Sequence, residues 1–146
     1  MNRNSMELSF DSKSQNESLA RSVAAAFSAQ LDPTIAELTD IRTAISEAVT
    51  NAIVHGYGND PTKKVYMRCT AEDGLLAFVI EDKGKGIENV ELAMQPFYTT
   101  EPGLERSGMG FSVMEAFMDG VIVESELGQG TRVTLKKNIS AVREDE

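Results

Sequence analysis

The stretch Glu47-Ala48-Val49-Thr50-Asn51 places two polar side chains inside an apolar helical pattern. Apolar residues recur around it at three- and four-residue steps, which is the spacing of one face of a long amphipathic helix. Because Glu47 and Asn51 are four residues apart, they share a face of that helix. His55 lies one turn further along, and Gly56 is predicted to end the helix in a left-handed conformation. The apolar residues are Ile35, Leu38, Ile41, Ile45, Ala48, Val49, Ala52 and Ile53.

A second informative stretch, Asp82-Lys83-Gly84-Lys85-Gly86, follows a short apolar run at 75–80. The run is too short for a surface helix, so we predict a buried strand that ends near Asp82. A carboxylate at that position is suited to accept a hydrogen bond from the amino group of adenine. Gly84 and Gly86 lack a Cβ atom and therefore let the backbone approach a flat base.

The third stretch, Ser107-Gly108-Met109-Gly110-Phe111, opens a predicted helix that continues to residue 118. Free backbone N–H groups and the positive end of a helix dipole bind phosphate oxygens at such positions. Arg106 directly precedes the stretch, and its planar guanidinium is a candidate for reaching a terminal phosphate. Each stretch is common by itself, but the three in this order predict an ATP site.

A segment without a regular pattern lies between the last two stretches, over about residues 88–107. It begins with a predicted short helix at 90–94, and two prolines and a glycine then interrupt any pattern. Long irregular segments in compact domains are often lids over active sites. We therefore predict an ATP lid here, with Thr99 and Thr100 on its phosphate side.

The remaining patterns predict two antiparallel hairpins, one strand and one helix. The Asp73-Gly74 pair is typical of a tight turn between the first two hairpin strands, and a loop with two glycines at 127–130 suits the second hairpin. The predicted strands are 6–10, 65–70, 75–80, 121–123 and 131–135, and the additional helix has its apolar stripe at Leu19, Val23 and Phe27.

Length and composition limit the classes of function. A chain of 146 residues is long enough for one domain with a proper core, so we expect residues 1–146 to form a single domain. The net charge of −9 argues against nucleic acid, because binding to its backbone relies on Lys and Arg. A single cysteine, Cys69, and the lack of a long apolar run or signal peptide predict a cytoplasmic protein without a membrane partner.

The three stretches together resemble the GHKL superfamily of ATPases and kinases. Residues 47–51 stand where that family has its N box, Asp82 to Gly86 match its first glycine box, and Ser107 to Gly110 match its second. The resemblance implies an α/β two-layer sandwich, with three helices on one face of a mixed, mostly antiparallel sheet. The nucleotide would then lie between the sheet and the helices.

Further residues are similar to the small protein-serine kinases that act as anti-sigma factors in sporulation. These residues are the lid-like sequence at 95–100, its continuation at 104–111, and Ser14 to Ser18 with Ala20 and Arg21. The similarity therefore covers nearly the whole chain. The only histidine is His55, so any phosphoacceptor is expected on another molecule.

This resemblance implies that the chain transfers phosphate from Mg-ATP to a serine of a partner protein. Asn51 would give an oxygen to Mg²⁺, which prefers oxygen ligands, and Glu47 would deprotonate the serine hydroxyl. Arg106, the amides of 108–111 and Mg²⁺ would neutralise the charge of the phosphates. Ser107, Gly108, Met109, Gly110 and Phe111 would thus belong to the nucleotide site.

The resemblance also implies three protein partners. The first is the sporulation sigma factor F, held when ATP is bound; the second is the anti-sigma factor antagonist, which would be phosphorylated; the third is a second copy, in a homodimer. Arg21 occupies the position that the family uses to contact sigma factor and antagonist. Glu101 departs from the family, which tends to have a basic residue there.

Simpler interpretations remain open. His55 is more often a locally bonded helix-end residue than a ligand, Arg21 can be a solvated helix residue, and Lys83 and Lys85 either face solvent or attract nucleotide. The whole chain can also be a nucleotide-sensing sigma-binding module without kinase activity, or a stress-response anti-sigma kinase with different partners. The acidic residue at position 47 favours a kinase, since an inert site needs no base.

Overall fold

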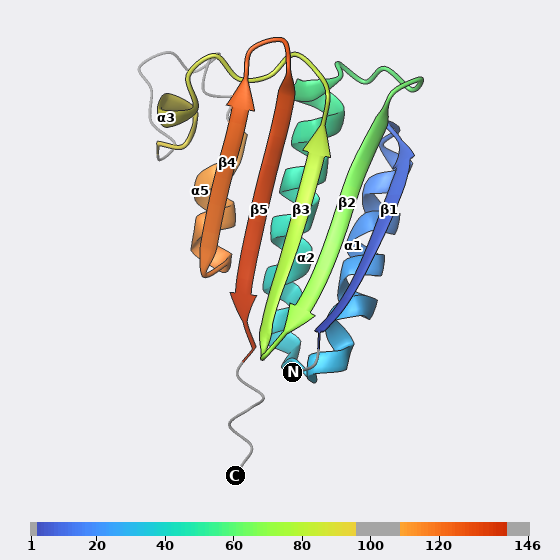
Figure 1. Cartoon of the computed structure of the whole chain (residues 1–146), viewed down its shortest axis with the longest axis vertical. Helices are drawn as coiled ribbons and strands as arrows, with labels where there is room; N and C mark the ends of the chain where they lie inside the picture. The colour runs from blue at the N-terminus through green and yellow to red at the C-terminus, as the bar shows by residue number, and fades with distance from the viewer. Residues whose placement is uncertain (1–2, 96–108, 140–146) are drawn as a thin grey trace.

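The computed structural model describes residues 3–95 and 109–139, and these form an antiparallel sheet covered on one face by helices (Figure 1). The strand order is β1-β2-β3-β5-β4. The strands are β1 Arg3–Asp11, β2 Lys64–Glu72, β3 Leu75–Asp82, β4 Gly120–Glu126 and β5 Gly130–Asn138. The helices are α1 Gln15–Ser28, η1 Ala29–Leu31, α2 Ile35–Thr50, η2 Asn51–Gly56, α3 Val90–Ala93 and α5 Phe111–Phe117.

The predicted two-layer sandwich is confirmed, and every strand pair that the structure describes is antiparallel. The prediction of a mixed sheet is therefore wrong for the strands that the structure describes. Both predicted hairpins are present: β2 pairs with β3 and β4 pairs with β5. Asp73 and Gly74 have φ values of 53° and 82°, the left-handed conformations that a tight two-residue turn between twisted strands requires. The local sequence therefore sets the register of β2 and β3.

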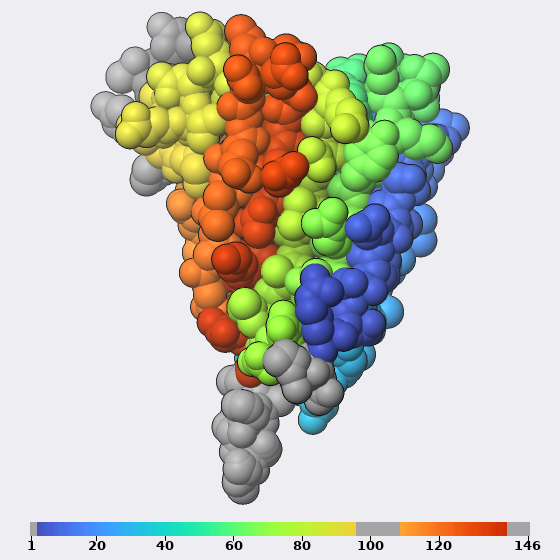
Figure 2. Space-filling model, in the orientation of Figure 1, coloured from blue at the N-terminus to red at the C-terminus, as the bar shows by residue number. Residues whose placement is uncertain are grey.

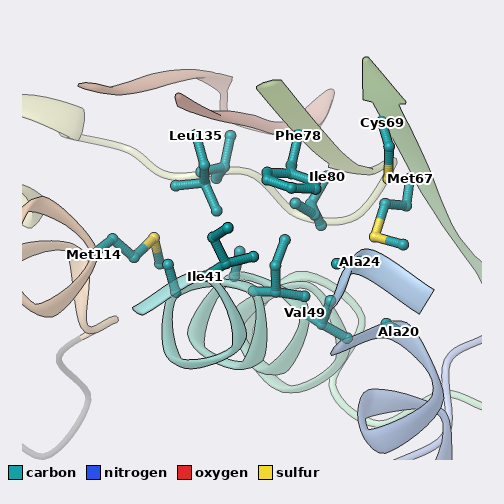
Figure 3. Packing of buried hydrophobic residues seen from close by; sticks show 14 of the residues in the cluster. Ala20, Ala24, Ile41, Val49, Met67, Cys69, Phe78, Ile80, Met114 and Leu135 are labelled. Atoms are coloured by element: carbon teal, nitrogen blue, oxygen red, sulfur yellow. The ribbon is translucent and has the colours of Figure 1, made fainter. Parts of the chain in front are cut away.

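The hydrophobic core lies between the helices and the inner face of the sheet, as Figure 3 shows for part of it. Ile41, Ile45 and Val49 of α2 are fully buried against Phe78 and Leu135. The helix α2 is therefore fixed at the centre of the helical layer. Its first residue, Ile35, is 83% exposed, which corrects its assignment to the apolar face.

The buried face of α1 differs from the predicted stripe. Ala20 and Ala24 are fully buried together with Phe27, whereas Leu19 is 47% exposed and Val23 is only partly buried. Small residues on the inner face let α1 lie close to α2 and the sheet. The following helix, α2, begins with a capping box between its N-cap Thr34 and Glu37. The prediction was wrong here because large apolar residues were given more weight than alanines.

No helix among the described residues covers the outer face of the sheet, which Figure 2 shows. Opposite charges on neighbouring strands pair across it, as in Arg68 with Glu7 at 3.2 Å and Arg132 with Glu81 at 3.5 Å. The ammonium of Lys83 lies 5.5 Å from the centre of the Tyr66 ring. Lys83 thus contacts the outer face of the sheet through Tyr66.

Residues of the predicted site meet at one end of the sheet, where the central strand β3 stops. There β3 ends at Asp82, the β4–β5 turn lies beside it, and the end of η2 and the start of α5 come from the helical layer (Figure 1). The short helix α3 agrees with the predicted helix at 90–94, and Asn89 caps it. Most of the predicted lid, including Thr99 and Thr100, lies outside the described residues.

Candidate nucleotide site

The helix that carries Glu47 and Asn51 changes its winding at Asn51. The α-helical part ends at Thr50, and residues Asn51–Gly56 form a π-helical turn, a feature often found at functional sites. The side-chain nitrogen of Asn51 donates a 2.5 Å hydrogen bond to the carbonyl oxygen of Met109. This bond joins the helix to the loop before α5 through the side-chain nitrogen of Asn51. The side-chain oxygen of Asn51 has no hydrogen-bond partner among the described residues.

Glu47 lies against the same loop. A Cβ atom on Gly110 would overlap the Glu47 carboxylate, and Gly110 has a φ of 67°, which side chains rarely adopt. Gly110 is the N-cap of α5, and no side chain caps that helix start. Burial raises the pKa of the Glu47 carboxyl above its usual range, which makes the group a stronger base when ionised.

Asp82 ends β3 in a buried position, with 5% of its surface exposed. Its Oδ1 accepts a 2.9 Å hydrogen bond from the backbone N–H of Gly84. Burial raises the pKa of Asp82 to about 6, although hydrogen bonds from the backbone of Gly84 and Thr131 act in the opposite direction. A buried carboxylate with one oxygen held in this way is ready to accept a further hydrogen bond from a ligand.

Gly56 has a role that differs from the predicted one. Gly56 does not have a positive φ. Gly58 and Asn59 instead adopt the left-handed conformation, with φ values of 59° and 63°. The prediction of Gly56 as a left-handed helix end is therefore wrong. A Cβ atom on Gly56 would lie 2.6 Å from the Asp82 carboxyl group, so this glycine is needed for close approach.

The glycine box packs tightly against its neighbours. A Cβ atom on Gly84 would overlap the carbonyl oxygen of Gly56, and one on Gly86 would overlap the carbonyl oxygen of Glu126. Gly86 also has a positive φ of 77°. Because neither position carries a side chain, the loop can pack directly against η2 and the β4–β5 hairpin.

A pocket opens between these elements. It is lined by side chains from both layers: Ala48, Asn51, Ala52, His55, Gly56, Ile80, Asp82, Gly86, Ile87, Met109, Phe111, Thr131 and Val133. Its walls are mostly apolar, with few polar groups, which is common in sites for small molecules. The predicted residues Asn51, Asp82, Gly86, Met109 and Phe111 are thus brought together, and Gly84 lies directly behind Asp82.

His55 is also part of this pocket. Burial and the charge of Lys85 lower the pKa of its imidazole, so the ring is neutral at pH 7. The sequence interpretation had favoured a purely local role for it. Thr131 was not predicted as a site residue. It pairs with Asp82 across β5 and β3, and a threonine in a predicted strand gives no signal of a partner that is distant in sequence.

Other predicted site residues lie outside the part of the chain that the structure describes. These are Thr99, Thr100, Glu101, Arg106, Ser107 and Gly108. Arg21 is described and lies far from these loops in sequence, on α1. Its side chain is 43% exposed and its Nε atom lies 2.9 Å from Glu17, one turn earlier.

The described residues also limit the kinds of metal site and membrane contact. No group of three or more His, Cys, Asp or Glu side chains among residues 3–95 and 109–139 could hold a metal ion. A magnesium ion bridged to nucleotide phosphates needs only one or two protein oxygens, and Asn51 fits that requirement. No helix in the same ranges is long and apolar enough to cross a membrane.

Known protein structures share this fold. The structure of the RsbU and RsbW domains of a Mycobacterium tuberculosis protein matches with a TM-score of 0.67 and 20% identity, over 93% of this chain and 32% of that one. The catalytic domain of the histidine kinase ThkA matches with a TM-score of 0.56 and 13% identity, over 95% of this chain and 97% of that one. At these identities the likeness concerns the fold alone.

Proteins found by sequence comparison are more similar to this chain than these structures are. Residues 10–137 match the family described as the histidine kinase-like ATPase domain. A protein named anti-sigma F factor from Geobacillus thermodenitrificans (strain NG80-2) is 58% identical over 138 residues, which cover 94% of both chains. Another of that name, from Clostridium botulinum (strain Eklund 17B / Type B), is 55% identical over 140 residues, which cover 96% of this chain and 98% of the relative. The chain therefore belongs to the histidine kinase-like ATPase family and, within it, to the anti-sigma F factors.

Proposed function

We propose that the chain is a single kinase domain, residues 1–146, that holds the sporulation sigma factor F when ATP is bound and phosphorylates a serine of the anti-sigma factor antagonist. One observation carries the proposal: Glu47 and Asn51 of one helix contact Met109 and Gly110, beside the pocket that Asp82 closes. Asn51 and Asp82 thus line one pocket, and the Glu47 carboxylate lies beside it, against Gly110.

Adenine binds in the pocket in this proposal. The ionised Asp82 accepts a hydrogen bond from the exocyclic amino group, while Gly84 holds the other side of the carboxylate in place. Ile80, Ile87 and Val133 supply apolar walls for the ring. The observation in support is that Asp82 is buried, oriented by its own loop, and part of the pocket lining.

The phosphates lie toward Gly110 in this arrangement. Asn51 has one side-chain oxygen available for a magnesium ion, which neutralises phosphate charge when it is bound. The backbone N–H groups of 108–111 would donate hydrogen bonds to phosphate oxygens. The sequence predicts further phosphate contacts from Arg106, Ser107, Thr99 and Thr100. Phosphoryl transfer depends mainly on positioning and charge neutralisation of this kind.

Glu47 acts as the general base. Its carboxylate takes the proton from the serine hydroxyl, the serine oxygen forms a bond to the γ-phosphorus, and the bond to the β-phosphate oxygen breaks to release ADP. The raised pKa of Glu47 supports the assignment, because a base works best when its pKa lies nearer to the pH of the reaction.

The relatives named anti-sigma F factor support the choice of partners. We propose sigma factor F, the antagonist and a second copy of the chain as partners, with Arg21 in the surface that sigma factor and antagonist both contact. Arg21 is half-exposed, and its Nε atom lies 2.9 Å from a carboxylate oxygen of Glu17. Arginine is a favoured anchor at protein interfaces.

The proposal is tested by incubating the protein with γ-labelled ATP, Mg²⁺ and the antagonist, and separately by measuring sigma factor binding with ATP and with ADP. Label on a serine of the antagonist, together with ATP-dependent sigma binding, is the expected result. Sigma binding without any labelled antagonist would instead identify a nucleotide-sensing module without kinase activity.

A charge reversal at Arg21 tests the partner surface separately. Arg21→Glu is expected to weaken binding of both sigma factor and antagonist by at least about tenfold, while ATP binding is unchanged. Arg42→Glu is the matched control, since Arg42 is an exposed arginine on α2. Equal calorimetric affinities of the Arg21 variant and the wild type for both partners would remove Arg21 from the interface.

A further inference from the structure

The glycine box is held in place by hydrogen bonds from outside the loop. The loop leaves β3 after Asp82 and has no regular secondary structure, so its backbone groups need partners elsewhere. Lys85 donates its N–H to the carbonyl oxygen of Gly56 at 3.0 Å, and its own carbonyl oxygen accepts from the N–H of Gly128 at 2.6 Å. The loop is thereby attached to η2 on one side and to the β4–β5 turn on the other.

The hydroxyl of Tyr57 is a third attachment. It accepts a 2.7 Å hydrogen bond from the N–H of Lys83 and donates one of 2.7 Å to the carbonyl oxygen of Lys64, at the start of β2. One hydroxyl group therefore fixes the first residue after Asp82 to a neighbouring strand. The aromatic ring alone makes neither bond.

Ser125 on β4 attaches the other end of the loop. Its hydroxyl accepts from the N–H of Ile87 at 2.8 Å and lies 2.9 Å from the carbonyl oxygen of Gly130 and 2.7 Å from the Thr131 hydroxyl. Thr131 lines the pocket, and its backbone bonds to Asp82. Ser125 thus links the end of the glycine box to the strand that lies beside the adenine acceptor.

Close backbone packing supports the same arrangement. Gly86 touches the carbonyl of Glu126, and Gly130 touches the carbonyl of Asp82, so closely that a Cβ atom on either glycine would overlap the neighbouring backbone. The loop therefore has little freedom to compensate for a lost bond by a small shift. Small changes in its attachment are expected to move the Asp82 carboxylate relative to the pocket.

We propose that Tyr57 and Ser125 are positioning residues for adenine recognition. Their hydroxyls hold the two ends of the 83–87 loop, so that the Gly84 N–H fixes Oδ1 of Asp82 and the carboxylate faces the amino group of the base. Neither residue touches the nucleotide. This inference rests on the proposed function of Asp82, and it adds two residues that determine base specificity.

Inosine triphosphate provides the probe, because it carries the same sugar and phosphates as ATP but lacks the amino group. Calorimetry or competition binding gives the dissociation constants of the wild type, Tyr57→Phe, Ser125→Ala and the double variant for both nucleotides. The ratio of the ITP constant to the ATP constant isolates the Asp82 contact. A general loss of stability would weaken both nucleotides alike and leave this ratio unchanged.

The ratio is expected to fall by about threefold in Tyr57→Phe, whose bonds lie at the surface, and by up to about tenfold in the double variant. Tyr66→Phe and Ser9→Ala are matched controls, since both remove a hydroxyl from the outer face of the sheet. Thermal unfolding verifies that each variant is folded.

Each outcome separates the two proposals. A wild-type protein that binds ATP and ITP equally would overturn the assignment of Asp82 as adenine acceptor. A wild type that discriminates, with variants that keep the wild-type ratio, would overturn the positioning role alone. Both proposals are supported if the ratio of the ITP constant to the ATP constant falls in Tyr57→Phe and Ser125→Ala and stays unchanged in the two control variants.

Discussion

The two ends of the pocket are built in different ways. The adenine end, Asp82 with the 83–87 loop, is bonded to η2, β2 and the β4–β5 hairpin. At the proposed phosphate end, Glu47 and Asn51 meet Met109 and Gly110, and one side-chain hydrogen bond joins the two elements among residues 3–95 and 109–139. We propose that the adenine end is held rigidly by this scaffold, whereas the phosphate end, with fewer contacts among the described residues, adjusts more readily to ligands and partners.

The largest expected effect concerns the phosphate end. Glu47→Gln keeps the size of the side chain and removes the base, so phosphate transfer to the antagonist should fall by about 10²–10⁴-fold while nucleotide and sigma factor binding are retained. Single-turnover assays with labelled ATP measure this change. A transfer rate equal to that of the wild type would show that the base is another group. The companion variant Asn51→Ala should instead weaken the magnesium-dependent part of nucleotide binding.

The next effect concerns the adenine end. Asp82→Ala removes the charged partner of the adenine amino group and should weaken ATP and ADP by about tenfold to a hundredfold. Glu81→Ala is a suitable control, because Glu81 is the neighbouring acid and pairs with Arg132 on the outer face. Isothermal calorimetry on the folded proteins decides the matter, and an unchanged affinity in the Asp82 variant contradicts the assignment.

Alanine at two glycines tests the difference in rigidity. At Gly84 the added Cβ meets the backbone of Gly56, which cannot move easily, so Gly84→Ala should destabilise the fold by more than about 2 kcal/mol. At Gly110 it meets the end of the Glu47 side chain, which can rotate, so Gly110→Ala should cost about 1–2 kcal/mol, from its positive φ.

The control for both is Gly120→Ala, because the nearest atom to a Cβ there is an ordinary 3.6 Å away. Chemical denaturation measures the three free energies of unfolding. A larger loss at Gly110 than at Gly84 would reverse the proposed difference between the two ends.

The smallest expected effect is one of pH. With the pKa of Asp82 raised to about 6, its carboxyl group becomes protonated below that pH and is then a much poorer acceptor for adenine, so ATP affinity should be weaker by up to about tenfold at pH 5 than at pH 7. ITP has the same titrating phosphates, so the ATP-to-ITP ratio removes their contribution. Asp82→Asn should flatten this ratio against pH, and a wild-type ratio that stays constant from pH 7 to 5 would contradict the raised pKa.

The raised pKa of Asp82 also makes the stability of the fold depend on pH. Because the folded state has the higher pKa, the folded protein binds the proton more tightly than the unfolded chain does. The contribution of Asp82 to the free energy of unfolding is therefore greatest below about pH 4 and is lost as the pH rises through 6. Nucleotide binding and stability thus respond to this carboxyl group in opposite directions.

Much of the fold follows from local sequence. The Asp73-Gly74 turn, the alternation in β2 and the apolar periodicity of α2 each depend on neighbours a few residues apart, so the hairpins and the central helix were predicted correctly. The buried face of α1 was not, because the small side chains of Ala20 and Ala24 suit a close helix contact that only the tertiary structure specifies.

The candidate site divides in the same way. Glu47, Asn51 and Asp82 stand out because polar residues interrupt apolar patterns. Tyr57 and Ser125 do not, since their partners Lys83 and Ile87 are distant in sequence and both bonds involve backbone atoms. The role of Gly56 was missed for a similar reason: the atoms that exclude a side chain there belong to Asp82 on another element.

The strand order also sets the course of folding. The hairpins β2–β3 and β4–β5 close short loops, so they can form quickly, but the pairing of β3 with β5 joins strands that are separated by both glycine-rich stretches. Asp82 faces Thr131 across this late pairing. Recovery of ATP binding during refolding is therefore expected to lag behind recovery of strand content measured by circular dichroism, and the ability to bind nucleotide reports the completion of the sheet.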